Sequence, residues 1–499
     1  MLFPTAAFSF AFLPIVLLAF FLIGRKHEYA AATWLFLASL FFYGYWMPEF
    51  TLLLVASIVV NYRVGMLISR RVASGTKTDR VLAKGALIAG ITIDLATLAY
   101  FKYANFFVDN LNTGLGLQFD IGRVILPVGI SFYTFTQIAF LADAYSKGIR
   151  EYKFAHYGLF VTYFPHLIAG PVLHHGQMMP QFASAPTYRP KVSNLAAGLA
   201  IFALGLIKKI VLADGVAPYA DAIFNAADSG LHPTFVEAWT GTLAYTFQIY
   251  FDFSGYSDMA IGLALLFNIR LPLNFNSPYK SLNIVEFWRR WHMSLSTFLR
   301  DYLYIPLGGS RHGPVRRHVN LMLTMVLGGL WHGASWTFVF WGALHGGYLI
   351  VNHAFAANLA RHNAVLERAR AWRALSMAMT FLCVVLAWVF FRAHSFAGAA
   401  SMLQSMSMFG AAVQPAGPHP VLWNAGLDAS RAWGWCAVLA LIAFAAPNSN
   451  AIGEAVLRRC VAARRTRSFV LGASVAAVVF LIVLNEARDS VSAFIYFNF

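Results

Sequence analysis

Long apolar segments, separated by short polar connections, recur along the whole chain. They occupy roughly residues 5–24, 31–47, 50–69, 85–103, 122–145, 154–173, 194–217, 235–254, 256–271, 319–355, 375–392, 432–447 and 469–485. A helix needs about 20 mostly apolar residues to cross the hydrocarbon core of a bilayer, so the shorter segments are expected to be re-entrant or buried. The pattern predicts an all-α polytopic membrane protein with about 11–13 transmembrane or re-entrant helices.

Basic residues occur in every second connection of the N-terminal half. They follow the first apolar segment at Arg25 and Lys26, and they recur within 70–84 and 147–153. The intervening connections, 47–49 and 105–120, contain no Lys or Arg. Because cytoplasmic loops are enriched in these residues, the pattern predicts basic loops inside and the N-terminus outside. No basic residue precedes the first segment, which favours a retained helix over a cleaved signal peptide.

The C-terminal half follows the same alternation. Basic residues lie within 361–373 and 458–467, whereas 394–430 contains no Lys or Arg. We therefore expect 394–430 and the C-terminal Phe499 on the outer, periplasmic side of a bacterial inner membrane.

Composition narrows the class further. Hydrophobic residues make up 59% of the chain and charged residues 12%, against about 25% charged in soluble domains. An ordinary soluble enzyme, a disordered chain and a secreted disulfide scaffold are thereby excluded. The net charge of +16 would suggest nucleic acid in a soluble protein. Here the positive charges alternate with apolar segments, so we expect contact with membrane lipid and no nucleic-acid partner.

One charged region interrupts the pattern. Residues 286–317 combine six arginines with many aromatic side chains, among them Arg289, Arg290 and Trp291. The region is too charged to span a bilayer and too aromatic for a free loop, so we expect an amphipathic segment at the cytoplasmic face. Its arginines could hold an anionic substrate or contact lipid phosphates, and the sequence leaves both readings open.

The segment 319–355 carries the strongest candidate for chemistry. It contains no formal charge from Val319 to Ile350, yet it holds His332 between Trp331 and Trp336. A neutral histidine can accept a proton from a hydroxyl group. One helix over the whole segment would be about 55 Å long. The segment is therefore expected to break near His332, where Gly328, Gly329 and Gly333 also permit close approach.

Two further histidines accompany it. His345 would lie on another face of a continuous helix, so a chelating pair is disfavoured and a helix–helix hydrogen bond is the expected role. His292 lies in the amphipathic segment, where Ser294 or Ser296 could hold it and Asp301 could orient a histidine. A hydrolase triad is weakly supported because no nucleophile elbow is present.

Other ionisable residues inside apolar segments are expected to bond helices together. The carboxyl groups in question are Asp94, Asp143, Asp252 and Asp258. His166, His174 and His175 resemble metal ligands in composition only, near prolines and glycines that indicate a break or re-entrant turn. No metal site is predicted.

Several blocks then resemble the membrane-bound O-acyltransferase family, and within it the bacterial alginate O-acetylase branch. They lie at 125–145, 163–173, 248–279, 286–309, 327–346 and 387–395. The most specific are WHMSLS, which contains His292, and LWHGASWTF, which contains His332. The signature covers about 126–395 of one domain over 1–499. His166 departs from the branch, which more often has glutamine there.

The resemblance implies a ring of helices around a central tunnel that joins a cytoplasmic acyl donor to an extracytoplasmic acceptor. It makes His332 the catalytic residue and His292 the second signature position. It implies no bound cofactor, with acetyl-CoA as donor substrate. The acceptor would be a polysaccharide such as alginate or cellulose, reached directly or through a periplasmic or membrane-anchored acetyltransferase partner.

The donor-binding candidates follow from the same resemblance and from the aromatic and charged surroundings of the two histidines. They are Arg289, Arg290, Trp291, Trp331, Trp336 and Asp301. Two rival functions stay open: a transporter or flippase for a lipid-linked sugar, for which the expected internal repeats are not apparent, and D-alanyl transfer to teichoic acid.

Overall fold

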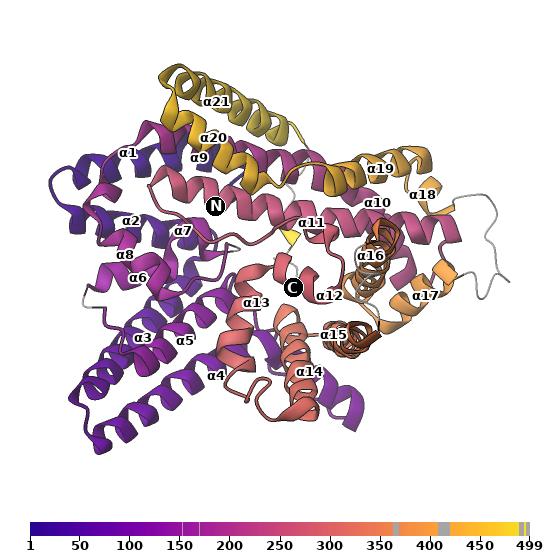
Figure 1. Ribbon diagram of the computed structural model, residues 1–499, viewed down its shortest axis with the longest axis horizontal. Coiled ribbons are helices and arrows are strands. Elements are labelled where there is room, and N and C mark those ends of the chain that lie inside the picture. The colour runs from indigo at the N-terminus through magenta and orange to yellow at the C-terminus, as the bar shows by residue number, and fades with distance from the viewer. Residues whose placement is uncertain (152, 169, 363–368, 408–419, 489–493, 496–499) are drawn as a thin grey trace. The chain divides into compact units, whose positions relative to one another are not determined.

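The computed structural model describes residues 1–499 except 152, 169, 363–368, 408–419, 489–493 and 496–499 (Figure 1). Every regular element in the described part is a helix, as the apolar pattern predicts. Contacts between residues divide the chain into two compact units. The first comprises Met1–Leu206, Tyr256–Leu273 and Ile452–Ala493, and the second comprises Ile207–Gly255, Asn274–Ala451 and Phe494–Phe499. The single domain over 1–499 stays a prediction.

The first unit contains the N-terminal helices and the last long helix, α21. Its helices are η1 (Ala7–Phe12), α1 (Leu13–Gly24), α2 (Glu28–Gly44), α3 (Pro48–Ser74), α4 (Lys77–Leu115), α5 (Ile130–Lys147), α6 (Phe154–Thr162), α7 (Phe164–Leu167), α8 (His175–Phe182), η2 (Ala185–Tyr188), α9 (Val192–Leu206), the end of α11 (Phe235–Leu266), most of α20 (Ser449–Ala462) and α21 (Arg464–Glu486).

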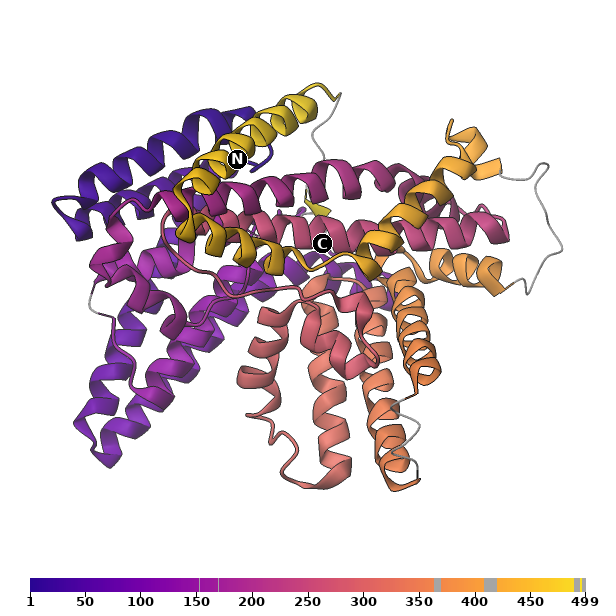
Figure 2. The same cartoon turned by 45° about the horizontal axis from the view of Figure 1, so that its top comes forward.

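The second unit contains both signature histidines. Its helices are η3 (Ile207–Ala213), α10 (Asp214–Asp228), the start of α11, η4 (Pro278–Lys280), α12 (Ile284–Arg290), α13 (Met293–Leu299), η5 (Arg300–Tyr304), α14 (Gly313–His332), α15 (Trp336–His362), α16 (Arg370–Arg392), α17 (Phe396–Ser407), α18 (Pro420–Asn424) and α19 (Ala429–Ala445). Helices α14, α15 and α16 lie side by side in Figures 1 and 2.

Six helical stretches of the described chain are long and apolar enough to cross a membrane. They are Ala7–Gly24, Pro48–Ser74, Lys77–Leu115, Val192–Asp228, Arg370–Arg392 and Arg464–Glu486. A seventh arises if α19 and α20, bent by 59°, form one span. The chain is thus an all-α polytopic membrane protein.

Two apolar segments that the sequence separates are one helix. The prediction of separate elements at 235–254 and 256–271 is wrong, because α11 runs from Phe235 to Leu266. The only residue that separated them is Gly255. A single glycine costs a helix about 1 kcal/mol relative to alanine, which tertiary packing readily offsets.

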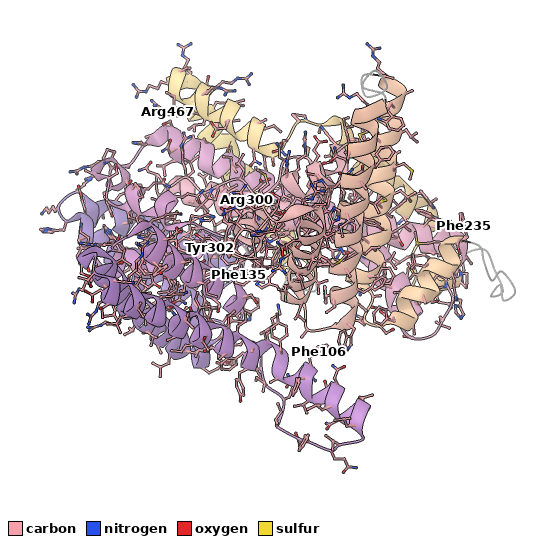
Figure 3. The ribbon with its side chains drawn as sticks, turned by 60° about the horizontal axis from the view of Figure 1, so that its bottom comes forward. Phe106, Phe135, Phe235, Arg300, Tyr302 and Arg467 are labelled. Carbon is pink, nitrogen blue, oxygen red and sulfur yellow. The ribbon has the colours of Figure 1, made fainter. Side chains whose placement is uncertain are left out.

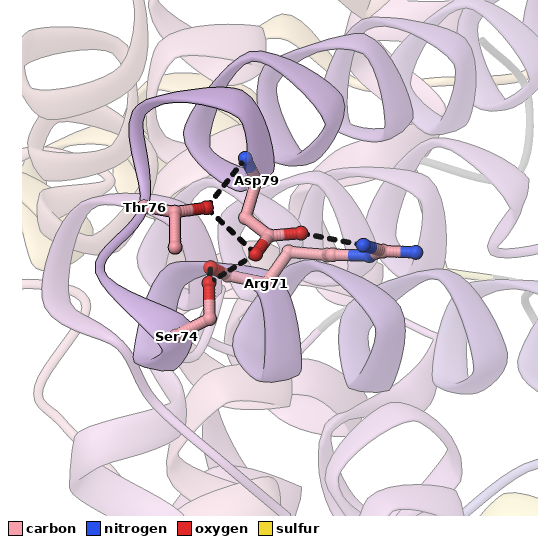
Figure 4. A network of polar contacts seen from close by, with 4 residues as sticks. All are labelled: Arg71, Ser74, Thr76 and Asp79. Atoms are coloured by element: carbon pink, nitrogen blue, oxygen red, sulfur yellow. Dashed lines mark hydrogen bonds and ion pairs between the residues drawn. The ribbon is translucent and has the colours of Figure 1, made fainter.

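The short connection between α3 and α4 is held by side chains (Figure 4). Gly75 has a φ of +74° and ends α3, and the Thr76 hydroxyl accepts a hydrogen bond from the Asp79 backbone at 3.1 Å. The Asp79 carboxylate accepts from Ser74 Oγ at 2.6 Å and pairs with Arg71 at 2.5 Å. This connection belongs to the 70–84 region that the charge pattern assigns to the cytoplasm.

Candidate active site

His332 is the last residue of α14, at the break that the length of the apolar segment predicts. The next residue, Gly333, is extended, and α15 begins at Trp336. The 319–355 segment is therefore two helices, and the break places His332 at the end of one of them.

Glycines bring the two helices together on either side of this break. A Cβ on Gly329 would lie 2.3 Å from the Phe338 carbonyl oxygen, and a Cβ on Gly342 would lie 2.3 Å from the Met325 carbonyl oxygen. A Cβ on Gly333 would meet the Phe338 ring at 2.2 Å. Close approach of α14 and α15 thus requires glycine here, which fixes the position of His332.

Aromatic rings surround His332, whose side chain is almost fully buried. The ring of Trp341 lies edge-on at 5.2 Å between centroids, that of Phe391 at 5.3 Å, and that of Trp331 at 5.0 Å. Such walls exclude water and restrict the imidazole to a small range of orientations. A histidine in these surroundings can exchange a proton with a substrate hydroxyl without competition from bulk water.

His292 lies between α12 and α13 in a conformation that few non-glycine residues adopt. Its φ is +43° and its ψ is +54°, in the left-handed region. Such conformations cost about 1–3 kcal/mol and persist where the surroundings determine them, often at functional sites. The neighbouring residues of WHMSLS therefore hold the imidazole in a specific direction.

Asn274 orients the His292 ring. Asn274 Oδ1 accepts from the Ser294 backbone at 3.3 Å and from Ser294 Oγ at 2.9 Å, and it lies 3.1 Å from His292 Nδ1. Because a backbone N–H can only donate, this oxygen is an acceptor, and Nδ1 is assigned the hydrogen. Nε2 is then the basic nitrogen. Burial lowers the pKa of His292 to about 3, so the ring is neutral at physiological pH.

The two signature histidines lie next to each other. The centroids of the His292 and His332 rings are 6.3 Å apart. Trp331 contacts both, at 5.0 Å from His332 and 6.2 Å from His292. Residues 40 positions apart in the sequence therefore form one site, within the second unit, where both imidazoles can act on one substrate.

A second layer supports the His292 side of the site. The Phe253 ring meets His292 edge-on at 4.7 Å, and Phe494 lies 5.6 Å behind Phe253. The adjacent Asp252 pairs with Lys209 at 2.6 Å and accepts from the Ile495 backbone at 3.0 Å. The prediction that Asp252 bonds parts of the fold together is confirmed.

His345 has the role expected from its position. Trp288 Nε1 donates to His345 Nδ1 at 3.3 Å, which joins α12 to α15. The ring packs on Trp341 at 4.8 Å, and Trp341 in turn packs on His332 at 5.2 Å. His345 therefore positions the aromatic wall and does not pair with His332.

The two arginines of WRRW, Arg289 and Arg290, differ in their contacts and exposure. Arg290 is tied within the fold, with Nη2 2.7 Å from Glu286 and Nη1 donating to the Asn276 carbonyl at 3.2 Å. Arg289 is exposed. It lies with Arg317 and His318 of α14 close enough to His353 of α15 for their charges to interact. This basic group on α12, α14 and α15 is a candidate anion site, and Arg289 is its exposed member.

The other donor-binding candidates occupy different surroundings. Trp291 is buried and stacks on Phe287 at 5.7 Å, and Trp331 touches both histidines. Trp336 is 54% exposed at the start of α15. Asp301 pairs with the adjacent Arg300 at 2.6 Å on η5, where Figure 3 labels Arg300 and Tyr302. The hydrogen bond that orients His292 thus comes from Asn274 and not from Asp301.

The predicted break around His166 and His175 is present, with α7 ending at Leu167 and α8 beginning at His175. His175 lies 3.8 Å from Glu151. Asp143 pairs with Lys147 one turn away at 2.8 Å. Within the described residues no three His, Cys, Asp or Glu side chains are grouped so as to hold a metal ion.

Comparison with known proteins identifies the family. The family model of the membrane-bound O-acyltransferases matches residues 57–393, which include both histidines. The chain belongs to this family. A peptidoglycan O-acetyltransferase of Helicobacter pylori is 43% identical over 433 residues, covering 81% of this chain and 80% of that protein. A probable alginate O-acetylase AlgI of Pseudomonas aeruginosa is 44% identical over 415 residues, covering 82% and 75%.

A more distant relative has another acyl group in its name. A teichoic acid D-alanyltransferase of Streptococcus thermophilus is 26% identical over 290 residues, covering 53% of this chain and 68% of that protein. This membrane-bound O-acyltransferase therefore lies in the alginate O-acetylase-like branch and is a multi-pass membrane enzyme.

Asn274 is a site residue that reasoning from the sequence missed, as are Trp341 and Phe391 beside His332. Asn274 lies in the 248–279 block, but a single asparagine has no spacing that marks it as a partner of a histidine 18 positions later. Its role depends on the turn that returns residues 274–276 to 290–294, where Met293 donates to the Asn274 carbonyl at 2.9 Å.

Proposed function

We propose that this O-acyltransferase moves an acetyl group from a cytoplasmic thioester, acetyl-CoA, to hydroxyl groups of an extracytoplasmic polysaccharide such as alginate or cellulose. The observation that carries the proposal is the buried pair His292 and His332, 6.3 Å apart, within the matched family region. The relatives named for peptidoglycan and alginate acetylation cover four fifths of the chain and favour acetyl transfer to a glycan.

His332 acts as the general base. It takes the proton of the acceptor hydroxyl while the hydroxyl oxygen attacks the thioester carbonyl. The carbon–sulfur bond then breaks, an ester remains on the acceptor, and the thiolate of the donor takes up the proton. His292, neutral and fixed by Asn274, orients the donor beside the carbonyl group.

The donor is anionic, and Arg289 and Arg317 supply positive charge on the second unit. Phosphates are held well by arginine, which presents several donors in a planar fork. Arg290 contributes less because Glu286 offsets its charge. Trp291, Trp331 and Trp336 belong to the aromatic surroundings of the donor site, and Asp301 orders Arg300 at its edge.

Family membership disfavours the flippase, which would need no acyl chemistry. D-Alanyl transfer is disfavoured because the relative with that name is less similar and matches about half of the chain. We place the enzyme in the bacterial inner membrane with both termini in the periplasm. A periplasmic or membrane-anchored acetyltransferase partner would receive or relay the acetyl group.

The test uses membranes that contain the full-length protein, acetyl-CoA labelled in the acetyl group, and alginate or cello-oligosaccharide as acceptor. We expect label in the glycan or in a co-expressed periplasmic partner, and none with the His332→Gln protein at equal membrane level. Label transfer from a D-alanyl carrier-protein thioester but not from acetyl-CoA would reject the proposed donor.

A further inference from the structure

A second buried polar cluster lies in the first unit and contains no residue assigned to acyl transfer. Helices α3, α4 and α5 run side by side there (Figures 1 and 2). Asn61 of α3, Asp94 of α4 and Gln137 of α5 are each at most 5% exposed, and both Asn61 and Gln137 donate to Ser57. Asn61 Nδ2 donates to Asp94 Oδ1 at 2.7 Å, and Gln137 Nε2 donates to Ser57 Oγ at 2.8 Å.

The cluster includes a carboxyl group on α4, one of the helices that are long and apolar enough to cross a membrane. Asp94 is ten residues from Lys84 and eight from Lys102, the basic residues on either side of it along α4. Ten helical residues rise about 15 Å, which is half of the roughly 30 Å hydrocarbon core. Figure 3 labels Phe106, which lies twelve residues after Asp94 on α4. A carboxyl group within a membrane-spanning helix is costly and usually has a functional partner.

Three acceptor oxygens of the cluster lack a hydrogen-bond partner among the described residues. They are Asn61 Oδ1, Asp94 Oδ2 and Gln137 Oε1. The buried hydroxyl groups of Tyr43, Tyr133 and Tyr157 also lack one. Tyr133 and Tyr157 are close enough to Asp94 for its charge to act on them. Each buried polar group left unsatisfied costs about 1–3 kcal/mol, so such a concentration indicates a bound species.

We propose that the Asn61–Asp94–Gln137 cluster binds a small monovalent cation such as Na⁺. Every available ligand is an oxygen, which suits a hard cation. One carboxylate balances one positive charge. The nearby basic groups do not balance the charge of the Asp94 carboxylate. Arg63 is exposed on α3, and Lys102 donates to Ser131 Oγ at 3.5 Å two turns further along α4.

The test measures thermal unfolding of the purified full-length protein in NaCl and in choline chloride at equal ionic strength. A ligand that binds only the folded state raises the unfolding midpoint with the logarithm of its concentration above Kd. We expect this rise with Na⁺, its loss in Asp94→Asn, and its retention in Asp109→Asn, which makes the same change at an exposed position of α4.

Direct binding keeps the test decisive if Asp94→Asn fails to accumulate. Equilibrium dialysis with ²²Na⁺ should show saturable binding of one ion per wild-type chain, and Gln137→Leu should weaken it by about tenfold or more. Equal midpoints in both salts with no saturable ²²Na⁺ binding would overturn the proposal and assign the cluster to water and a protonated Asp94. Loss of acetyl transfer in His332→Gln tests the proposed function only. It changes neither the salt dependence of unfolding nor the ²²Na⁺ binding.

Discussion

The histidine site of the second unit and the Asp94 cluster of the first unit both place titratable groups among buried side chains, but their backbones differ. Around the histidines the helices are short or broken: α12 ends two residues before His292, and α14 ends at His332. Around Asp94 the helices α3 and α4 are continuous over 27 and 39 residues.

The two regions also differ in what their buried titratable groups need in order to be stable. A histidine can be buried neutral, because desolvation simply disfavours its protonated form. A carboxylate that is buried equally deeply needs a bound cation, a proton or several hydrogen-bond donors. Broken helices expose backbone ends and place side chains at defined angles, which suits a reaction. Continuous helices present side chains to a fixed interior, which suits a bound ion.

The largest expected effect comes from replacing His332, in the histidine site of the second unit. His332→Gln keeps a hydrogen-bonding side chain but removes the base, so acetyl transfer should fall by about 10²–10⁴-fold while membrane level is maintained. The measurement is labelled acetyl in the glycan per amount of enzyme. His345→Gln is the matched control, because His345 bonds Trp288 and should lose activity mainly through lower protein level. Near-normal transfer by His332→Gln would remove His332 from the mechanism.

The helix break offers the second test. Gly329→Ala would put a Cβ 2.3 Å from the Phe338 carbonyl oxygen, so α14 and α15 must separate and His332 must shift. Misplacement by about 1 Å can cost about 10²-fold in rate. We expect a fall of this order in kcat at matched membrane level. Gly347→Ala is the control, since a Cβ there meets nothing within 4 Å. Equal activity of the two variants would show that the close approach is not required.

The sequence predicts the broken segment at His332 and the structural role of His345, because segment length and helical phase are local properties. It also predicts the helix–helix role of Asp252. It does not predict that α11 is continuous through Gly255, since tertiary packing determines whether a helix continues through a single glycine. It also does not predict Asn274 as the partner of His292, because that contact depends on a turn between distant positions.

The third prediction tests the left-handed backbone at His292. Asparagine adopts this conformation more readily than other non-glycine residues, whereas alanine lacks a side chain that compensates for the strain. His292→Asn should therefore retain more membrane protein and more thermal stability than His292→Ala. Both should transfer acetyl more slowly than wild type, by about 10-fold or more, if the imidazole orients the donor. Equal stability of the two variants would show that the conformation at 292 imposes no constraint.

The smallest expected effect concerns the adjacent residues Arg289 and Arg290. The side chain of Arg289 is exposed, whereas that of Arg290 is paired with Glu286. Arg289 is exposed beside Arg317 and His318, so Arg289→Gln should raise the apparent KM for acetyl-CoA about 3- to 10-fold with little change in kcat. Arg290 is paired with Glu286 and bonded to the Asn276 carbonyl. Arg290→Gln should leave that KM nearly unchanged and lower protein level instead, because it removes the contact that holds the end of α12 against residues 274–276. Kinetics in proteoliposomes at several salt concentrations would separate these outcomes, since an effect through the donor's phosphates weakens as salt rises. An unchanged KM in Arg289→Gln at low salt would leave Arg289 as a contact for lipid phosphate.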